Sequence, residues 1–176
     1  MVVKKLKITS AIYTNKQLNS YLDYIDCALL MSKEYSLVYE DLDLDDAIKT
    51  CINNNLIPII SINKIITPND TKKVYTLLEK YKDNPDIYFY ITDLGCARMG
   101  KRLNIINRMI FNPETMITNT LDLLEYASLG FDALAMSHEI TLEDFLKSYN
   151  EAKVNLFYLG FGHRLMFYSK RKLISL

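Results

Sequence analysis

The chain has 176 residues, of which 49% are hydrophobic, and its 21 basic and 21 acidic side chains leave no formal net charge. This length suffices for one domain with a hydrophobic core, and we expect residues 1–176 to form a single domain. The balanced charge excludes a bulk electrostatic attraction to nucleic acid and leaves only a local basic patch open.

The three cysteines, Cys27, Cys51 and Cys96, stand far apart in the sequence. Because neither a Cys-x-x-Cys pair nor a zinc-type Cys/His spacing occurs, the pattern supports neither a disulfide scaffold nor a zinc module. The first residues lack the apolar segment of a signal peptide, and no window approaches the roughly 18 apolar residues of a membrane helix. We therefore expect a cytoplasmic protein with reduced thiols and no membrane contact.

Hydrophobic runs and helix-capping residues alternate along the whole chain. The runs predict strands, most of them continuous enough to be buried on both faces, and the segments between them have helical periodicity. In chain order we expect a strand at 6–12, a helix at 15–25, a strand at 27–31, a helix at 43–52, a strand at 56–62, a helix at 68–81, a strand at 87–91, a helix at 98–106, a strand at 109–112, a helix at 120–128, a strand at 131–136, a helix at 141–149 and a strand at 154–159.

This alternation predicts a parallel sheet with crossover helices. Seven strands, with an eighth compatible with the tail, favour a (β/α) TIM-type barrel. Such barrels typically have about 250 residues, so this one is expected to be minimal, incomplete or completed by a partner. An open doubly wound sheet is the alternative. No Gly-x-Gly-x-x-Gly turn follows the first strand, so a dinucleotide site lacks support.

Polar residues collect where the predicted strands end, and in a parallel sheet these ends share one face. They are Asn63, Lys64, Asp93, Cys96, Asn112, Glu114, Ser137, His138, Glu139, His163 and Arg164. A mixture of acids, bases and amides is what a catalytic or binding mouth contains. The alternative is that these residues are polar only because strand ends meet water.

Several of these residues have both a functional and a purely structural interpretation. Gly160 and Gly162 would allow a close approach of backbone to a ligand that Arg164 clamps, or they only relieve crowding. Glu139 is an acid/base candidate or a support for the following helix. Cys96, with basic residues nearby, is a candidate nucleophile if its pKa is lowered.

Four motifs follow one another from Asp93 onward. They are Asp-Leu-Gly at 93–95, Leu-Gly-Phe-Asp at 129–132, Ser-His-Glu-Ile-Thr-Leu-Glu-Asp at 137–144 and Gly-His-Arg-Leu-Met-Phe-Tyr-Ser-Lys-Arg-Lys-Leu at 162–173. With Asn112 between the first two, this succession resembles the collagenase-like peptidase family, U32. The last motif looks like the family's signature, in which Gly-Arg or His-Gly is followed by Leu-Met and then by Ser-x-Arg-Cys.

The resemblance implies a (β/α) barrel, a bacterial cytoplasmic protein and a hydrolase of the protease class that acts on peptides or a small molecule. Within it, we expect Glu139 or His163 to be the catalytic acid/base. The residues expected to bind substrate are Asp93, Asn112, Ser137, Arg164, Ser169 and Arg171.

Other members of the family resemble iron–sulfur proteins whose cluster ligands are cysteines in and around the closing signature. In this sequence Lys172 stands where the signature cysteine is expected, and no cysteine follows Cys96. We therefore expect neither a family-type cluster nor another cofactor or metal.

Two other functions stay open. A non-catalytic or partner-dependent member would need a protein partner or a homodimer. An RNA-modification factor would bind RNA through the basic residues Lys170, Arg171 and Lys172 interleaved with Phe167 and Tyr168, because aromatic rings stack on bases and cations contact phosphates.

Overall fold

The computed structural model describes residues 6–163 and Ser169. Its centre is one sheet of seven parallel strands in the order β1-β2-β3-β4-β5-β6-β7, so each strand pairs only with its neighbours in the chain. The strands are β1 (Thr9–Ile12), β2 (Cys27–Leu30), β3 (Ile57–Ile62), β4 (Tyr88–Ile91), β5 (Met109–Phe111), β6 (Ala133–Ala135) and β7 (Leu156–Phe157).

A helix connects each strand to the next, as parallel pairing requires. The helices are α1 (Asn15–Tyr21), α2 (Leu44–Asn53), α3 (Thr71–Tyr81), α4 (Leu94–Arg102), α5 (Thr120–Ala127) and α6 (Leu142–Ala152), with a short 3₁₀ helix, η1 (Ile106–Arg108), before β5. Among the described residues, no helix is long and apolar enough to cross a membrane.

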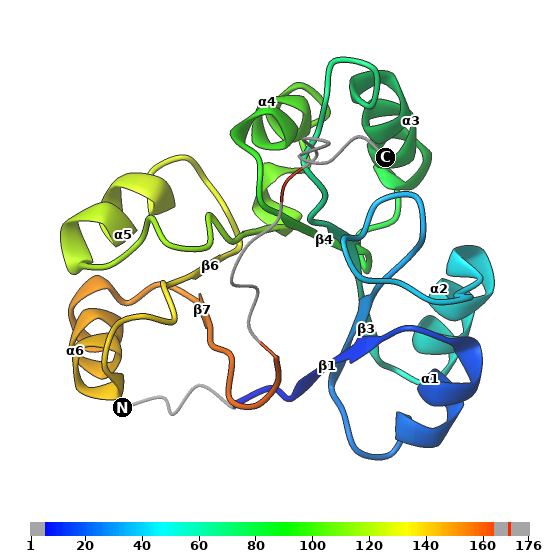
Figure 1. Cartoon of the computed structure of the whole chain (residues 1–176), viewed down its shortest axis with the longest axis horizontal. Coiled ribbons are helices and arrows are strands. Elements are labelled where there is room, and N and C mark those ends of the chain that lie inside the picture. Colours follow the sequence, from blue (N-terminus) through cyan, green and yellow to red (C-terminus); the bar gives the residue numbers. More distant parts are fainter. Residues whose placement is uncertain (1–5, 164–168, 170–176) are drawn as a thin grey trace, which may run out of the picture.

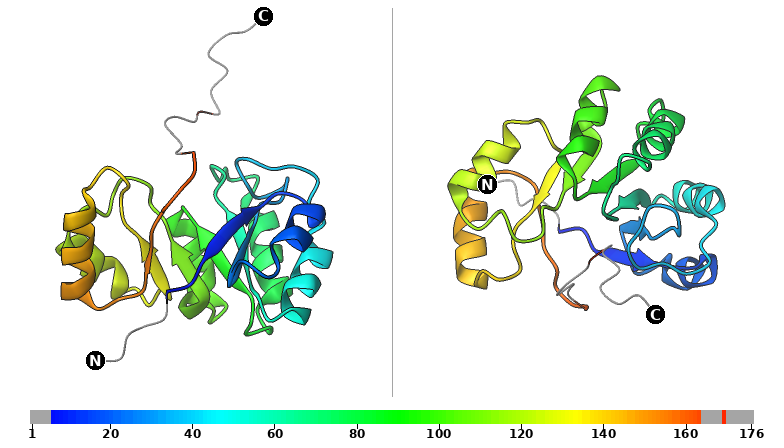
Figure 2. Two further views of the ribbon diagram at one scale, coloured as in Figure 1. Left: turned by 90° about the horizontal axis from the view of Figure 1, so that it is seen from below. Right: turned by 45° about the horizontal axis from the view of Figure 1, so that its top comes forward.

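The sheet curls, and the helices lie on its convex side (Figures 1 and 2). β1 and β7 are its two edges. This arrangement confirms the expected α/β fold as an incomplete TIM-type barrel. A doubly wound sheet would have helices on both faces, so that alternative is wrong.

Alternate residues of each strand point to opposite faces of the sheet, which gives two separate hydrophobic clusters. The larger cluster lies between the sheet and the helices and contains Ile60, Phe89 and Phe111. The smaller one lines the concave inner face. Its members are Cys27, Ile59, Ile110 and Ala133, with the partly buried Leu29, Ile57, Tyr88, Tyr90 and Phe157 packed against them.

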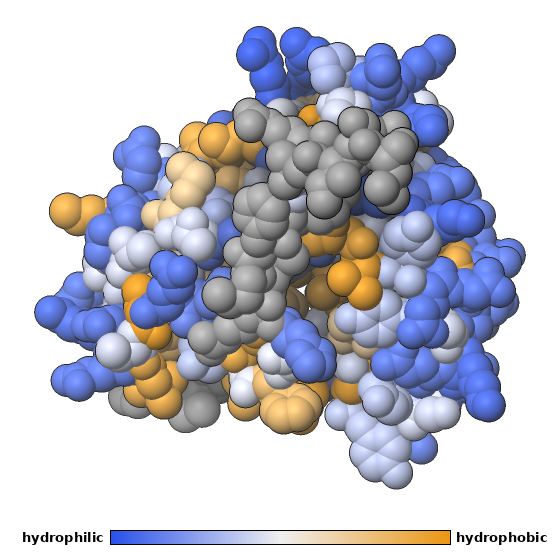
Figure 3. Space-filling model, in the orientation of Figure 1, coloured by the Kyte–Doolittle hydropathy of each residue, from blue (hydrophilic) through white to orange (hydrophobic). Residues whose placement is uncertain are grey.

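The inner face is less completely covered than the outer one. In the space-filling view, hydrophilic side chains cover most of the periphery, and hydrophobic side chains border an opening near the centre (Figure 3). Tyr90 and Phe157 are in ring contact there, with centroids 5.7 Å apart, and both remain partly exposed. The concave face is therefore reachable from solvent.

The predicted elements are all present, with shifted ends. The largest shift concerns the helix expected at 98–106, which is α4 and begins at Leu94 because the Asp93 side chain caps it. The helix after β5 is capped by Asn119 instead of Thr120, through hydrogen bonds from the backbone N–H groups of Leu121 and Asp122. The eighth strand expected in the tail falls outside the described residues.

Arg108 holds the turn that precedes β4. Its guanidinium donates hydrogen bonds to the carbonyl oxygens of Lys82, Asn84 and Ile87, the last at 3.0 Å, and the residue is only 9% exposed.

We expect Arg108→Ala to lower the free energy of unfolding by about 3 kcal/mol, because three carbonyls lose a charged donor. Urea unfolding measures this, and Arg102→Ala on the exposed end of α4 is the control, expected to change stability by less than about 0.5 kcal/mol. Equal losses in the two variants would contradict the assigned role.

Candidate functional site

Three polar side chains meet at the carboxyl ends of β4 and β5. Asn112 follows β5 directly and is 9% exposed. Its amide nitrogen lies 2.5 Å from the phenol oxygen of Tyr90 and 3.1 Å from Oε1 of Glu114. One nitrogen therefore brings a phenol and a carboxylate together, and we call Tyr90, Asn112 and Glu114 the strand-end trio.

The turn after β5 fixes the carboxylate of Glu114. The Glu114 N–H donates to Oδ1 of Asn112 at 3.1 Å, so both ends of the asparagine amide are engaged. Glu114 has φ = 60°, in the left-handed region that side-chain-bearing residues rarely adopt. A glutamate held in this conformation costs stability, and such outliers cluster at functional sites.

Burial raises the pKa of both titratable members of the trio, Glu114 and Tyr90. Loss of solvent raises the pKa of Glu114 above its usual value, while the nearby charge of His138 and the Asn112 hydrogen bond act in the opposite direction. Burial and the neighbouring Glu114 charge raise the pKa of Tyr90, so its phenol stays protonated at physiological pH. The Tyr90 oxygen accepts from Asn112, which leaves its O–H to donate elsewhere.

Ser137, after β6, borders the trio. It is 1% exposed, and its backbone N–H donates to the carbonyl oxygen of Ile117 at 2.8 Å, which ties the β5–α5 loop to the end of β6. Its hydroxyl accepts a hydrogen bond from the backbone N–H of Glu139 at 3.2 Å. The loop that contains Glu114 is thus anchored beside His138.

Of the other predicted site residues that the structure describes, Asp93, Glu139 and His163 are not among the hydrogen-bond partners of the trio. Asp93 uses its carboxylate to cap α4, accepting from the Gly95 N–H at 2.5 Å. Glu139 has an exposed side chain, and His163 is exposed after β7. Ser169 is partly buried, and Arg164 and Arg171 fall outside the described residues. All of these stay predictions.

Tyr90 is a site residue that the sequence reasoning missed, and Glu114 was noted only as one of many strand-end polar groups. The run Ile-Tyr-Phe-Tyr-Ile at 87–91 reads as a buried strand, and nothing in it distinguishes the inward-facing tyrosine. The available signal was the spacing Asn112-Pro113-Glu114 directly after a strand, which is typical of a turn that directs two polar side chains to one place.

The cysteines do not suit an iron–sulfur cluster, which needs several thiolates at one point. Cys27 belongs to the inner cluster of the sheet, whereas Cys51 and Cys96 lie on α2 and α4 in the outer cluster. Burial raises the pKa of all three thiols, that of Cys51 to about 11 and that of Cys96 to about 12. Cys96 was considered as a nucleophile with a lowered pKa, and its shift is in the opposite direction. Within the described part of the chain, no group of three or more His, Cys, Asp or Glu residues could hold a metal ion.

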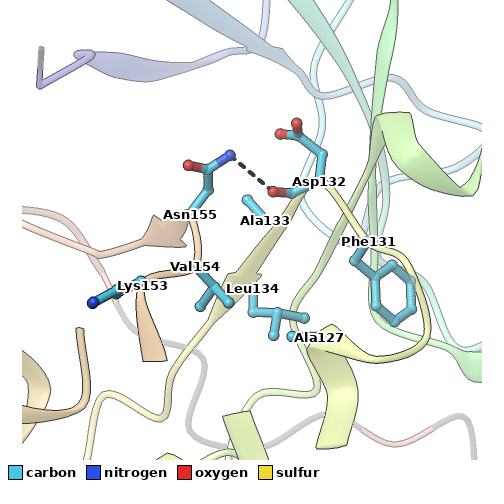
Figure 4. A pocket seen from close by; sticks show the side chains of 8 residues that line it. All are labelled: Ala127, Phe131, Asp132, Ala133, Leu134, Lys153, Val154 and Asn155. Carbon is cyan, nitrogen blue, oxygen red and sulfur yellow. Dashed lines mark hydrogen bonds between the residues drawn. The ribbon is translucent and has the colours of Figure 1, made fainter. Parts of the chain in front are cut away.

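Figure 4 shows a pocket of about 240 Å³. Its lining residues lie at the amino ends of β6 and β7, whereas the trio lies at the carboxyl ends of β4 and β5. The pocket is formed by the end of α5, the start of β6 and the turn before β7. The Asn155 amide there donates to the carbonyl oxygen of Asp132 at 3.1 Å. Because barrel enzymes carry their sites at the carboxyl ends of the strands, we place the candidate site at the trio and not in this pocket.

Residues 32–176 of the chain match the model of the family described as Peptidase family U32. No curated protein matches. Among solved structures, that of the U32 peptidase Mk0906 is similar, with a TM-score of 0.65 and 10% sequence identity, over 90% of this chain and 71% of that one. This likeness concerns the fold, whereas the family match spans most of the sequence. The chain therefore belongs to peptidase family U32.

Proposed function

We propose that this chain hydrolyses peptide bonds at the strand-end trio, with Glu114 as general base and the Tyr90 O–H as donor to the oxyanion. Membership of a peptidase family supports the reaction class. The single observation that supports these roles is the contact of one Asn112 nitrogen with both the phenol and the carboxylate. A positioned base beside a fixed donor is the minimum that amide hydrolysis requires.

The reaction follows from these groups. Glu114 in its ionised form removes a proton from a water molecule, whose oxygen forms a bond to the carbonyl carbon of the substrate. The carbonyl oxygen becomes an oxyanion and receives a hydrogen bond from the Tyr90 O–H. The carbon–nitrogen bond then breaks, and the proton held by Glu114 passes to the leaving amine, so the carboxylate is regenerated. Asn112 positions both groups.

The sequence-based proposal of Glu139 or His163 as acid/base is an alternative within the same function. Glu114 differs from these two residues in its environment: it is partly buried and burial raises its pKa, whereas Glu139 and His163 are exposed. A raised pKa brings a carboxylate closer to the range in which a general base both accepts and releases a proton. Glu139→Gln and His163→Ala, assayed beside Glu114→Gln, identify the carboxylate or imidazole whose loss stops turnover.

Hydrolysis of peptides is tested with a broad fluorogenic peptide panel and with gelatin. We expect cleavage whose kcat/KM rises with pH, because the base must be ionised. The midpoint of that rise should lie above that of an ordinary glutamate, in the direction of the Glu114 pKa. A protein that cleaves nothing in the panel or in gelatin between about pH 5 and 9 would contradict the proposed function.

A further inference from the structure

Ser61 carries a buried hydroxyl that has no hydrogen-bond partner in the described part of the chain. It lies at position 61 of β3, two residues beyond Ile59 and four beyond Ile57, both of which belong to the inner cluster. By strand alternation its side chain faces the same concave surface. The residue is 0% exposed, and its Oγ has no partner among the described residues. Such an orphan hydroxyl costs stability and calls for an explanation.

The backbone around Ser61 is firmly held, so the hydroxyl has a fixed origin. The Ser36 hydroxyl donates to the Ser61 carbonyl oxygen at 3.3 Å. The same loop is fastened to the end of β3 by a hydrogen bond from the Leu37 N–H to Oδ1 of Asn63 at 2.8 Å. The carbonyl oxygen of Ser61 is therefore hydrogen-bonded, whereas its Oγ has no partner among the residues that the structure describes.

The sheet register sets Ser61 beside the candidate site. Ser61 on β3 is paired with Tyr90 on β4, and the Tyr90 phenol contacts the Asn112 amide. Ser61 thus extends the strand-end trio by one strand. Its neighbours on the inner face are largely apolar, with Ile59 and Phe157 in the cluster there, and the charged member of the trio, Glu114, follows β5, two strands away.

We propose that Ser61 is a substrate-binding residue whose hydroxyl hydrogen-bonds to a main-chain amide beside the scissile bond, and that the substrate segment on this side is uncharged and apolar. The inference rests on the proposed function. A hydroxyl both donates and accepts, so it can pair with either the N–H or the C=O of a peptide group. Because the free chain covers Ser61 completely, contact requires a side-chain rearrangement on the inner face, of the kind that accompanies many binding events.

The test compares Ser61→Ala with Ser32→Ala. Ser32 is the matched control, because its hydroxyl is also buried and without a partner among the described residues, but it belongs to the turn after β2 and not to the sheet. Two readouts are needed. The first is KM and kcat for an apolar fluorogenic peptide, and the second is the affinity of N-acetyl-trialanine amide by NMR titration, which requires no turnover.

For Ser61→Ala we expect KM and the dissociation constant of the probe to rise about five- to tenfold, the loss of one neutral hydrogen bond, with kcat and Tm little changed. Ser32→Ala should leave the affinity for the probe as in the unaltered chain. Three outcomes would overturn the inference: no binding of the probe to the unaltered chain, equal effects of the two substitutions, or a lower Tm with unchanged affinity, which indicates an internal water. If the probe binds as expected but no peptide is cleaved, the proposed function fails and the binding role of Ser61 stands.

Discussion

Replacing Glu114 with glutamine should reduce kcat/KM for peptide hydrolysis by about 10²- to 10⁴-fold, the usual contribution of a positioned general base. Glutamine keeps the size of the side chain and can still contact the Asn112 amide, but it cannot remove a proton from water. Steady-state kinetics on a peptide that the unaltered chain cleaves measure the effect. KM should change little, because the lost interaction belongs to the transition state.

The same substitution should raise stability at neutral pH. The pKa of Glu114 is raised by burial, so the folded state holds its proton more tightly than the unfolded state does. Stability is therefore lost as pH rises from the unfolded to the folded pKa, and glutamine removes this loss. A higher Tm together with lost activity distinguishes a catalytic carboxylate from a structural one. Glu125→Gln on the exposed surface of α5 should change neither, and a fully active Glu114→Gln variant would remove Glu114 from the mechanism.

Tyr90→Phe should lower kcat by about 10²- to 10³-fold, as removal of an oxyanion donor does in other hydrolases. The phenylalanine ring keeps the contact with Phe157 and the packing of the inner face. The decrease in kcat therefore measures the contribution of the O–H group alone. Because burial raises the pKa of Tyr90, the phenol remains a donor throughout the assay range, and its removal should lower the plateau of the pH profile without moving its acidic limb.

Tyr88→Phe is the matched control for this experiment. Tyr88 lies on the same strand and the same inner face, two residues before Tyr90, and burial raises its pKa as well. Its hydroxyl is farther from the carboxyl end of β4, where the trio lies. Equal rate losses in Tyr88→Phe and Tyr90→Phe would indicate a general effect on the inner face and would refute the assignment of Tyr90 as donor.

The order of strands and helices was predictable because its signals are local. Continuous apolar runs and capping residues depend on neighbours a few positions away. The helices expected at 43–52 and 141–149 are indeed capped by the first residue of each range, Asp43 and Thr141. The predicted start of α4 was wrong by four residues, because the capping role of the Asp93 side chain was not recognised in the sequence.

The composition of the candidate site was predictable only in part. Asn112, Glu114 and Ser137 follow strands, and their position at the strand ends placed them among the candidates. Tyr90 was not found, because a strand buried on both faces shows no polar alternation that would reveal which residue faces inward. The raised pKa of Glu114 depends on solvent excluded by packing distant in sequence, and no local pattern encodes that exclusion.

The strictly sequential strand order has a consequence for how the chain folds. A closed barrel must join its first strand to its last, a contact that spans the whole chain and carries a large loop-closure cost. Within the described sheet, every pairing joins adjacent βα units instead. The contact order is correspondingly low for a parallel sheet, so folding can begin at one unit and spread to its neighbours, in the manner of a repeat protein.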